Sequence, residues 1–266
     1  MKRLIINSDD YGRTPEISRG IRETHLRGVV TSTTCMMNIP TTAEDIAVAL
    51  KETPTLGMGV HLVLTMGSPI SAPETVSSLT DEEGHFFKYQ PLLKQLSDIK
   101  VEEVKREWQA QIEAFLRAAG HKPTHLDSHH HSSYFSPALF RAMLELAKEY
   151  DCAIRFPFAG DTSKELEETN KHVPALIQEF DLPRPDLFLV DFYDERATLA
   201  ELLNMIRNLP DGTTEIMCHP GYTNTAFANE SVYNIQRDRE LEVLTDPSVK
   251  EAIQANGIQL VSFANL

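Results

Sequence analysis

Thr124-His125-Leu126-Asp127-Ser128-His129-His130-His131 is the stretch around which we predict the rest of the chain to fold. Four imidazoles and one carboxylate fall within its last seven residues. Lys122-Pro123 precedes it as the start of a strand, and alternate side chains of a strand share one face, so His125, Asp127 and His129 are expected on the same side. Neutral imidazole is the commonest metal ligand and carboxylate its usual companion on a divalent ion. We therefore predict a metal site here in preference to a solvated polar loop.

The bulk composition narrows the class of protein. The chain has 266 residues, enough for one large α/β domain, of which 41% are hydrophobic and 24% charged. Its formal net charge of -14 repels phosphate backbones, so nucleic acid is not expected as a partner. No apolar run approaches the roughly 20 residues that a membrane span needs, so a membrane is not expected as a partner either.

The cysteines and the first residues of the chain indicate the cellular compartment of the protein. Cys35, Cys152 and Cys218 lie far apart in apolar runs, as expected for buried, reduced thiols. No CxxC pair is present, which argues against a structural zinc held by thiolates. The segment 1–7 becomes polar too early for a signal peptide. Together these features predict a cytoplasmic protein.

Strand and helix patterns alternate along almost the whole chain. We predict strands at 4–6, 29–38, 56–64, 124–131, 152–155, 187–190, 215–218 and 258–262. We predict helices at 14–27, 42–50, 101–119, 137–150, 199–209, 239–244 and 249–256. Three long excursions interrupt the pattern, at 66–100, 160–184 (helical in part) and 219–237. The alternation favours an α/β fold with a parallel sheet, an irregular (βα) TIM-like barrel, as a single domain over residues 1–266, with an open doubly wound sheet as the alternative.

Nearly every predicted strand ends in a polar or charged residue. In βα folds the reactive groups sit at the carboxyl ends of the strands, so these side chains are expected on one rim. The residues are Asp9, Asp10, Asn38, His61, the 125–131 cluster, Arg155, Asp191 and His219. Each alone has an ordinary explanation: a helix cap for Asp9 or Asp10, a core histidine at 61, a structural Arg155–Asp191 pair, a turn at 219. Their convergence on one rim favours a reactive site.

Five segments of the sequence form a recognisable set: Asn7-Ser8-Asp9-Asp10-Tyr11-Gly12, Thr31-Ser32-Thr33-Thr34, Gly59-Val60-His61-Leu62, Pro123-Thr124-His125-Leu126-Asp127-Ser128-His129-His130 and Met217-Cys218-His219-Pro220. They resemble signature segments of the YdjC-like carbohydrate deacetylases, a family that includes chito-oligosaccharide deacetylases. The resemblance implies an irregular βα barrel, one divalent metal ion and removal of acetyl from an N-acetylated sugar. It also implies Asp10, His61 and His125 as metal ligands and Asp9 as general base. Ser8, Tyr11 and Ser132-Ser133 depart from the family pattern, which leaves the exact sugar open.

The chemistry of amide hydrolysis suggests roles for the remaining rim residues. The leaving amine needs a proton, and we expect His219, with an ordinary histidine pKa near ~6.5, to donate it as general acid, with Asp191 as an orienting partner. Asp127, His129, Arg155 and Asp191 are expected to orient the metal ligands or to bind substrate. The loop aromatics Phe86, Phe87 and Tyr89 could stack on sugar rings or hold the loop together.

Several alternatives stay open from the sequence. The metal, Mg or Zn, is not fixed, nor is the oligomeric state, for which a homodimer is one candidate. A metal-dependent sugar isomerase, another amidohydrolase, or a non-catalytic metal- or sugar-binding protein would use the same scaffold. An amidohydrolase would usually carry an HxH pair on its first strand, where this chain has Asp9-Asp10. A binding protein would have no need of Asp9.

Overall fold

The long first strand forms the centre of the sheet. The computed structural model describes residues 1–156 and 164–266, and in it β1 (Lys2–Tyr11) is buried along most of its length. Strand β7 (Gly212–Cys218) pairs with β1 on one side from Lys2 to Ser8. On the other side β8 (Gln259–Leu260) pairs with the start of β1, and β2 (Ser32–Cys35) pairs with its end. A register shift between Ser8 and Tyr11 interrupts the β1–β2 ladder, and this irregularity falls at the two aspartates.

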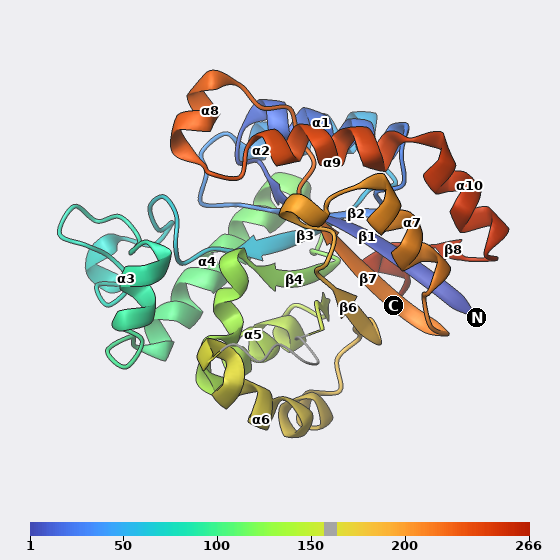
Figure 1. The fold of residues 1–266 in the computed structure, drawn as a ribbon. Coiled ribbons are helices and arrows are strands. Elements are labelled where there is room, and N and C mark those ends of the chain that lie inside the picture. The colour runs from blue at the N-terminus through green and yellow to red at the C-terminus, as the bar shows by residue number, and fades with distance from the viewer. Residues whose placement is uncertain (157–163) are drawn as a thin grey trace.

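The sheet is parallel throughout and runs in the order β5-β4-β3-β2-β1-β7-β6, with β8 beside β1. The other strands are β3 (Gly57–Leu62), β4 (His125–Ser128), β5 (Ala153–Ile154) and β6 (Leu187–Leu189). Figure 1 shows the sheet curled, with helices around its outer face. Among the described residues, the edge strands β5 and β6 do not pair with each other. The α/β, TIM-like fold is therefore confirmed as a single-domain half-barrel whose backbone ladder is open on one side.

Helices cross over between most successive strands, as a parallel sheet requires. They are α1 (Pro15–Leu26), α2 (Thr42–Glu52), α3 (Tyr89–Lys94), α4 (Val101–Ala119), α5 (Pro137–Glu149), α6 (Lys164–Phe180), α7 (Leu199–Arg207), α8 (Thr225–Glu230), α9 (Ile235–Thr245) and α10 (Pro247–Ala255). Short 3-10 turns add η1 (Pro73–Thr75), η2 (His129–Tyr134), η3 (Asp194–Arg196) and η4 (Phe263–Asn265). Helix α1 begins as expected, with Thr14 accepting from the Ile17 N–H and Pro15 in the first turn. None of the helices within 1–156 and 164–266 is long and apolar enough to cross a membrane.

The strand lengths and the first and third excursions differ from the sequence prediction, whereas the second excursion is helical in part, as predicted. The second and last strands are much shorter than the apolar runs 29–38 and 258–262, whose flanking residues pack in loops. The first and third excursions contain short helices, α3 and α8. The second contains α6, while the part of that prediction at 160–163 lies outside the described residues.

The histidine stretch departs most from its predicted form. Strand β4 ends at Ser128, and the chain then turns into η2. His130 and His131 have φ of 54° and 56°, in the left-handed region. The alternation that would have placed His125 and His129 on one face therefore stops one residue before His129.

Candidate metal centre and active site

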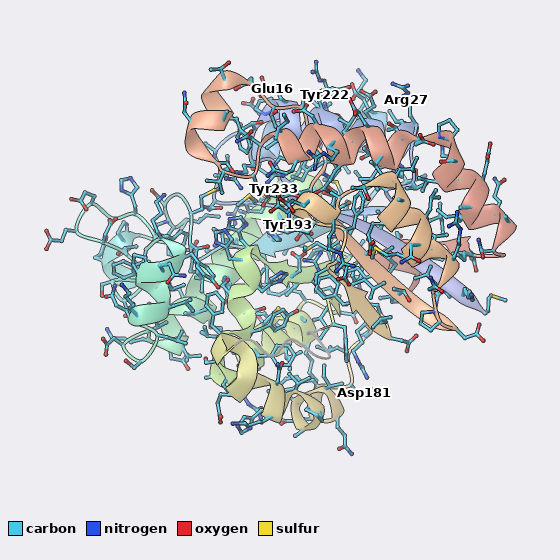
Figure 2. The ribbon with its side chains drawn as sticks, in the orientation of Figure 1. Glu16, Arg27, Asp181, Tyr193, Tyr222 and Tyr233 are labelled. Atoms are coloured by element: carbon cyan, nitrogen blue, oxygen red, sulfur yellow. The ribbon has the colours of Figure 1, made fainter. Side chains whose placement is uncertain are left out.

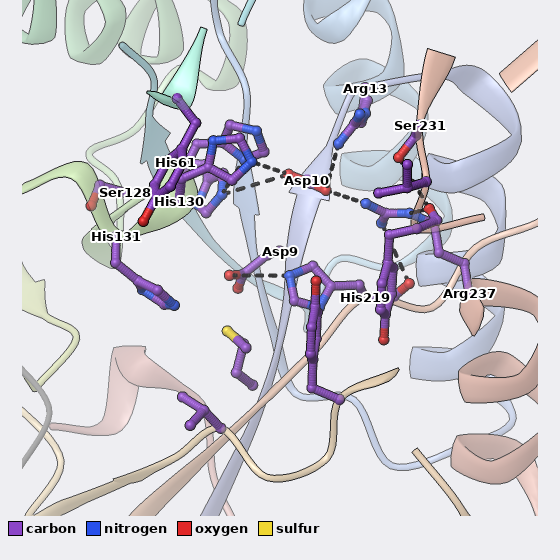
Figure 3. A pocket seen from close by; sticks show the side chains of 17 residues that line it. Asp9, Asp10, Arg13, His61, Ser128, His130, His131, His219, Ser231 and Arg237 are labelled. Atoms are coloured by element: carbon purple, nitrogen blue, oxygen red, sulfur yellow. Dashed lines mark hydrogen bonds and ion pairs between the residues drawn. The ribbon is translucent and has the colours of Figure 1, made fainter. Parts of the chain in front are cut away.

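A cavity of about 480 Å³ opens at the carboxyl ends of β1, β3, β4 and β7. Figure 3 shows Asp9 and Asp10 from β1, His61 from β3 and His219 from the end of β7 around it. The structure therefore brings these four predicted rim residues together in one cavity. The chemistry each could perform follows from its individual contacts.

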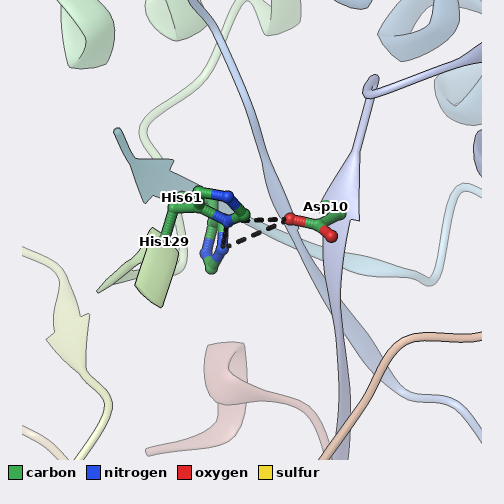
Figure 4. A group of neighbouring side chains, drawn as sticks. All are labelled: Asp10, His61 and His129. Carbon is green, nitrogen blue, oxygen red and sulfur yellow. Dashed lines mark hydrogen bonds and ion pairs between the residues drawn. The ribbon is translucent and has the colours of Figure 1, made fainter. Parts of the chain in front are cut away.

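Asp10, His61 and His129 form a compact, buried triad of metal-ligand type (Figure 4). Asp10 Oδ1 lies 3.1 Å from His129 Nδ1 and 3.6 Å from His61 Nε2, and the two nitrogens are 3.3 Å apart. These are the spacings of ligand atoms that share one ion at about 2.1 Å from each. Asp10 Oδ1 is buried and has no hydrogen-bond donor among the described residues. The residues present therefore fit a divalent cation.

The other oxygen of Asp10 is held by two arginines. Arg237, buried in α9, pairs with Asp10 Oδ2, and Arg13 Nη1 lies 3.3 Å from the same oxygen. Burial alone would raise the pKa of Asp10, but these cations and His129 hold it well below its usual range. Asp10 is thus an ionised carboxylate with one oxygen fixed and one directed at the two imidazoles.

Asp127 orients His61 from behind. Its Oδ1 lies 2.6 Å from His61 Nδ1, which leaves Nε2 directed at Asp10. Thr34 donates its hydroxyl to the other oxygen of Asp127. A carboxylate behind an imidazole fixes the tautomer and ring orientation that a metal ligand needs. This contact agrees with the orienting position predicted for Asp127.

Asp9 is bound by the side chain of Arg155. Arg155 Nη1 and Nη2 donate to the two oxygens of Asp9 at 2.8 and 2.6 Å, and Nη1 also lies 2.9 Å from Asp127 Oδ2. Burial would raise the pKa of Asp9, but Arg155 holds it far below its usual range. Asp9 with His61 and Asp127 also has metal-ligand spacing. Arg155 already occupies both oxygens of Asp9 and one oxygen of Asp127, whereas Asp10 directs Oδ1 at the two imidazoles, so the triad with Asp10 is the better cation site.

In Figure 3, His219 lies across the cavity from His61. Its Nε2 is 3.8 Å from Asp9 Oδ2, and its backbone N–H donates to Glu240. Tyr193 and Tyr233 are stacked on each other, and both rings meet the His219 ring edge-on; Figure 2 labels the two tyrosines. Burial lowers the pKa of His219 to about 4. The sequence predicts an ordinary histidine pKa, and the pKa in the structure is lower because protein encloses the imidazole.

Two predicted site residues lie away from the cavity. His125 Nε2 is 3.1 Å from Asn7 Oδ1, and its ring is stacked on Phe263 at a centroid distance of 3.6 Å. Burial lowers its pKa well below the usual range, so it is a neutral, packed imidazole beneath the site. Asp191 is half exposed and pairs with Arg196 at 2.5 Å, so it does not contact His219. The structural Arg155–Asp191 pair is also not formed, because Arg155 binds Asp9.

The loop aromatics separate into two groups. Phe86 is buried in the core, and Phe87 packs against the core. Only Tyr89 lines the cavity, where its ring meets His130 edge-on at 5.3 Å.

Four charged residues of the site were not singled out from the sequence: Arg13, Glu215, Arg237 and Glu240. Glu215 is fully buried on β7 and accepts from Arg155 Nε at 2.8 Å. The available signal was a carboxylate in the middle of an apolar strand pattern, Glu215-Ile216-Met217-Cys218. Arg237 and Glu240 lie in or beside a polar excursion, where nothing distinguishes a buried charge from a solvated one.

Comparison with known sequences places the chain in a family. The family profile described as YdjC-like protein matches residues 3–255. The chain belongs to the YdjC-like family. A carbohydrate deacetylase of Enterococcus faecalis is 40% identical over 270 residues, covering 100% of this chain and 98% of the relative. A carbohydrate deacetylase of Brevibacillus brevis is 38% identical over 265 residues, covering 99% of both.

Two solved structures share the fold of this chain. A protein of Enterococcus faecalis V583, described in terms of cellobiose-phosphate cleavage, has a TM-score of 0.87 at 38% identity, covering 99% of this chain and 98% of its own. A family 4 acetyl xylan esterase of Clostridium thermocellum, solved with a cobalt ion, has a TM-score of 0.53 at 11% identity, covering 99% of this chain and 89% of its own. At that identity the second structure shares the fold alone.

Proposed function

We propose that this YdjC-like protein is a metal-dependent carbohydrate deacetylase that hydrolyses the N-acetyl group of an N-acetylated sugar or chito-oligosaccharide. The observation that carries the proposal is the juxtaposition of the Asp10–His61–His129 triad with Asp9 and His219 in one cavity. The relatives named as carbohydrate deacetylases support the reaction and the substrate class.

Asp10, His61 and His129 would hold one divalent ion, with Asp127 orienting His61. The family resemblance implies His125 as the third metal ligand. We propose His129 instead, because His125 packs between Asn7 and Phe263. Such an ion supplies Lewis acidity, which polarises the acetyl carbonyl and makes a water more acidic. Two imidazoles favour Zn over Mg on affinity, so we propose Zn as the tighter-bound ion.

Asp9 accepts the proton of the attacking water. Arg155 keeps its carboxylate ionised and fixed, so it is available as a base at neutral pH. Being held on both oxygens by one guanidinium, Asp9 remains oriented toward the cavity without having to serve as a metal ligand.

His219 protonates the leaving amine. Because burial makes this imidazole neutral at pH 7, it must acquire the proton during the reaction. Asp9 at 3.8 Å is the nearest group to supply it, which completes a relay from water through Asp9 to Nε2 and then to the amine. The net result balances: water is consumed, acetate and a sugar amine are released.

The rival functions fit the site less well. A sugar isomerase uses several acidic metal ligands, whereas this triad has one carboxylate and two imidazoles. A binding protein would have no use for a second buried carboxylate and an imidazole beside the triad. The three buried cysteines, none of which forms a disulfide, support a reducing compartment, and we propose the cytoplasm.

The test is acetate release from a panel of N-acetylated sugars of one to three units. The chelated protein should be inactive, and Zn²⁺, Co²⁺ or Mg²⁺ added singly should restore turnover to different extents. Asp9→Asn should retain the metal and lose about 10²-fold or more in kcat, the range for removing a general base. Isomerised sugar with no acetate, or full activity in Asp9→Asn, would refute the proposal.

A further inference from the structure

Arg155 spans the inside of the half-barrel with its side chain, on the side where the edge strands β5 and β6 do not pair among the described residues. It follows β5, an edge strand, and its side chain reaches β1 and β7 in the other half of the sheet. It is fully buried. A side chain therefore joins two parts of the sheet that the backbone ladder leaves unjoined among the described residues.

Three carboxyl groups share this one guanidinium. Nη1 and Nη2 bind Asp9, Nη1 also meets Asp127, and Nε donates to Glu215 Oε1 at 2.8 Å. A guanidinium is a rigid, planar fork, so fixing its Nε sets the direction in which Nη1 and Nη2 point. The contact with Glu215 consequently determines how Arg155 meets Asp9.

A second residue holds the face of the same group. Phe188 on β6 is the register partner of Glu215 on β7, and the Arg155 Cζ lies 4.6 Å from the centre of its ring. Phe188 thus packs against the face of the guanidinium, and Glu215 binds its Nε. Strand β6 is the edge strand opposite β5, the strand that Arg155 follows, and β7 lies next to β6.

We propose that Glu215 is a positioning residue for Asp9: by holding Arg155 at Nε, it directs the two remaining nitrogens at both oxygens of the base. The inference rests on the proposed function, in which Asp9 is that base. This role depends on the length of the Glu215 side chain, because its acceptor oxygen must come within hydrogen-bond distance of Arg155 Nε.

Negative charge on Glu215 is not required for this role. Burial raises its pKa to about 8, so the neutral acid predominates at pH 7. Its second oxygen, Oε2, is buried and has no hydrogen-bond partner within the described parts of the chain. Glutamine has the same length and presents an acceptor oxygen to Nε, whereas aspartate keeps the carboxyl group but is one methylene shorter.

The experiment compares Glu215→Gln with Glu215→Asp. Glu215→Gln should keep kcat within about threefold of the parent, while Glu215→Asp should lose roughly 10- to 100-fold in kcat, the cost of a misplacement near 1 Å. In both, KM and bound metal should be unchanged, because Asp10, His61 and His129 are untouched. The matched control is Glu107→Asp, since Glu107 is equally buried but caps the Ile70 and Ser71 N–H groups away from the cavity. It should lower Tm and leave kcat unchanged.

Crystal structures of both variants give a readout that does not depend on activity. The two-nitrogen contact of Arg155 with Asp9 should persist in Glu215→Gln and be lost in Glu215→Asp. Retention of that contact or of full kcat in folded Glu215→Asp, or loss of either in Glu215→Gln, would overturn the inference. If Glu215→Asp does not fold, the Glu215→Gln outcomes still decide it. A parent protein that releases no acetate would refute the proposed function, and the crystal structures would still test the positioning role.

Discussion

The assignment of His129 in place of His125 as the third metal ligand can be tested by removing each imidazole. The substitutions are His129→Ala and His125→Ala. They lie four residues apart in one segment, yet one imidazole faces Asp10 and the other faces Phe263. The two variants should therefore fail in different ways.

For His129→Ala we expect a large loss of metal affinity. Groups that only contact a ligand typically contribute 10- to 100-fold to affinity, so a direct ligand should contribute at least ~10²-fold, or about 2.8 kcal/mol. The remaining pair, Asp10 and His61, are 3.6 Å apart and provide two protein donors. The metal-free His129→Ala protein should unfold near the temperature of the metal-free parent.

For His125→Ala we expect lost stability with little lost affinity. The substitution removes a stacked ring pair and a hydrogen bond to Asn7, and it leaves a cavity at a fully buried position. Together these cost about 2–4 kcal/mol, which corresponds to about 5–10 °C in Tm for a chain of this size. Metal affinity should stay within about tenfold of the parent, as expected when no ligand is removed.

Titration calorimetry of Zn²⁺ into chelator-treated protein measures the affinities, and calorimetric melting of the metal-free forms measures Tm. The reasoning would be refuted if His125→Ala lost the metal while His129→Ala bound it like the parent. That result would show that the β4 segment rearranges when the ion binds.

Three further predictions follow from the contacts of single side chains. His219→Ala should bind metal normally and lose much more kcat on an N-acetyl sugar than on an activated acetyl ester, whose leaving group needs no proton; equal losses would remove the general-acid role. Burial raises the pKa of Glu215 from 4.5 to about 8 in the folded protein. Between these two pH values the unfolded chain loses this proton and the folded protein keeps it, so the free energy of unfolding should fall as pH rises, by up to about a few kcal/mol. Glu215→Gln should flatten that fall in Tm between pH 5 and 8, and an unchanged slope would contradict the raised pKa. Asp191→Ala should change kcat and Tm little, because its pair with Arg196 is exposed; a loss above tenfold would place Asp191 in the reaction.

The fold was predictable because strand and helix periods alternate along the chain. The position of the active rim followed from the same pattern, since Asp9, Asp10, His61 and His219 all come at or just after the ends of strands. Neither strand length nor barrel closure was predictable in the same way. Apolar runs such as 29–38 continue past the paired residues because their flanks pack in buried loops.

The proposed ligand set was only partly predictable, because one backbone turn decides which histidine lies beside Asp10. Period-2 alternation would align His125 with His129, but β4 ends between them and η2 redirects His129 toward Asp10. The local sequence does not mark the end of β4 at Ser128, because three histidines follow it and none of them is a glycine or proline that would signal a turn. Glu215 and Arg237 were missed for another reason: their importance comes from pairing with residues 60 and 227 positions away.

The left-handed backbone at Asp10 limits how this site can change in evolution. Its φ is 69°, and His130 and His131 beside the triad have similar values. Aspartate, asparagine, histidine and glycine tolerate this conformation, whereas β-branched residues do so at a substantial cost. If the triad holds a metal ion as proposed, a lineage that loses this ion should most readily acquire Asn or Gly at position 10, which removes the charge and keeps the turn. In a library randomised at that position and selected for folding alone, Asn, Asp and Gly should be enriched and Val and Ile depleted.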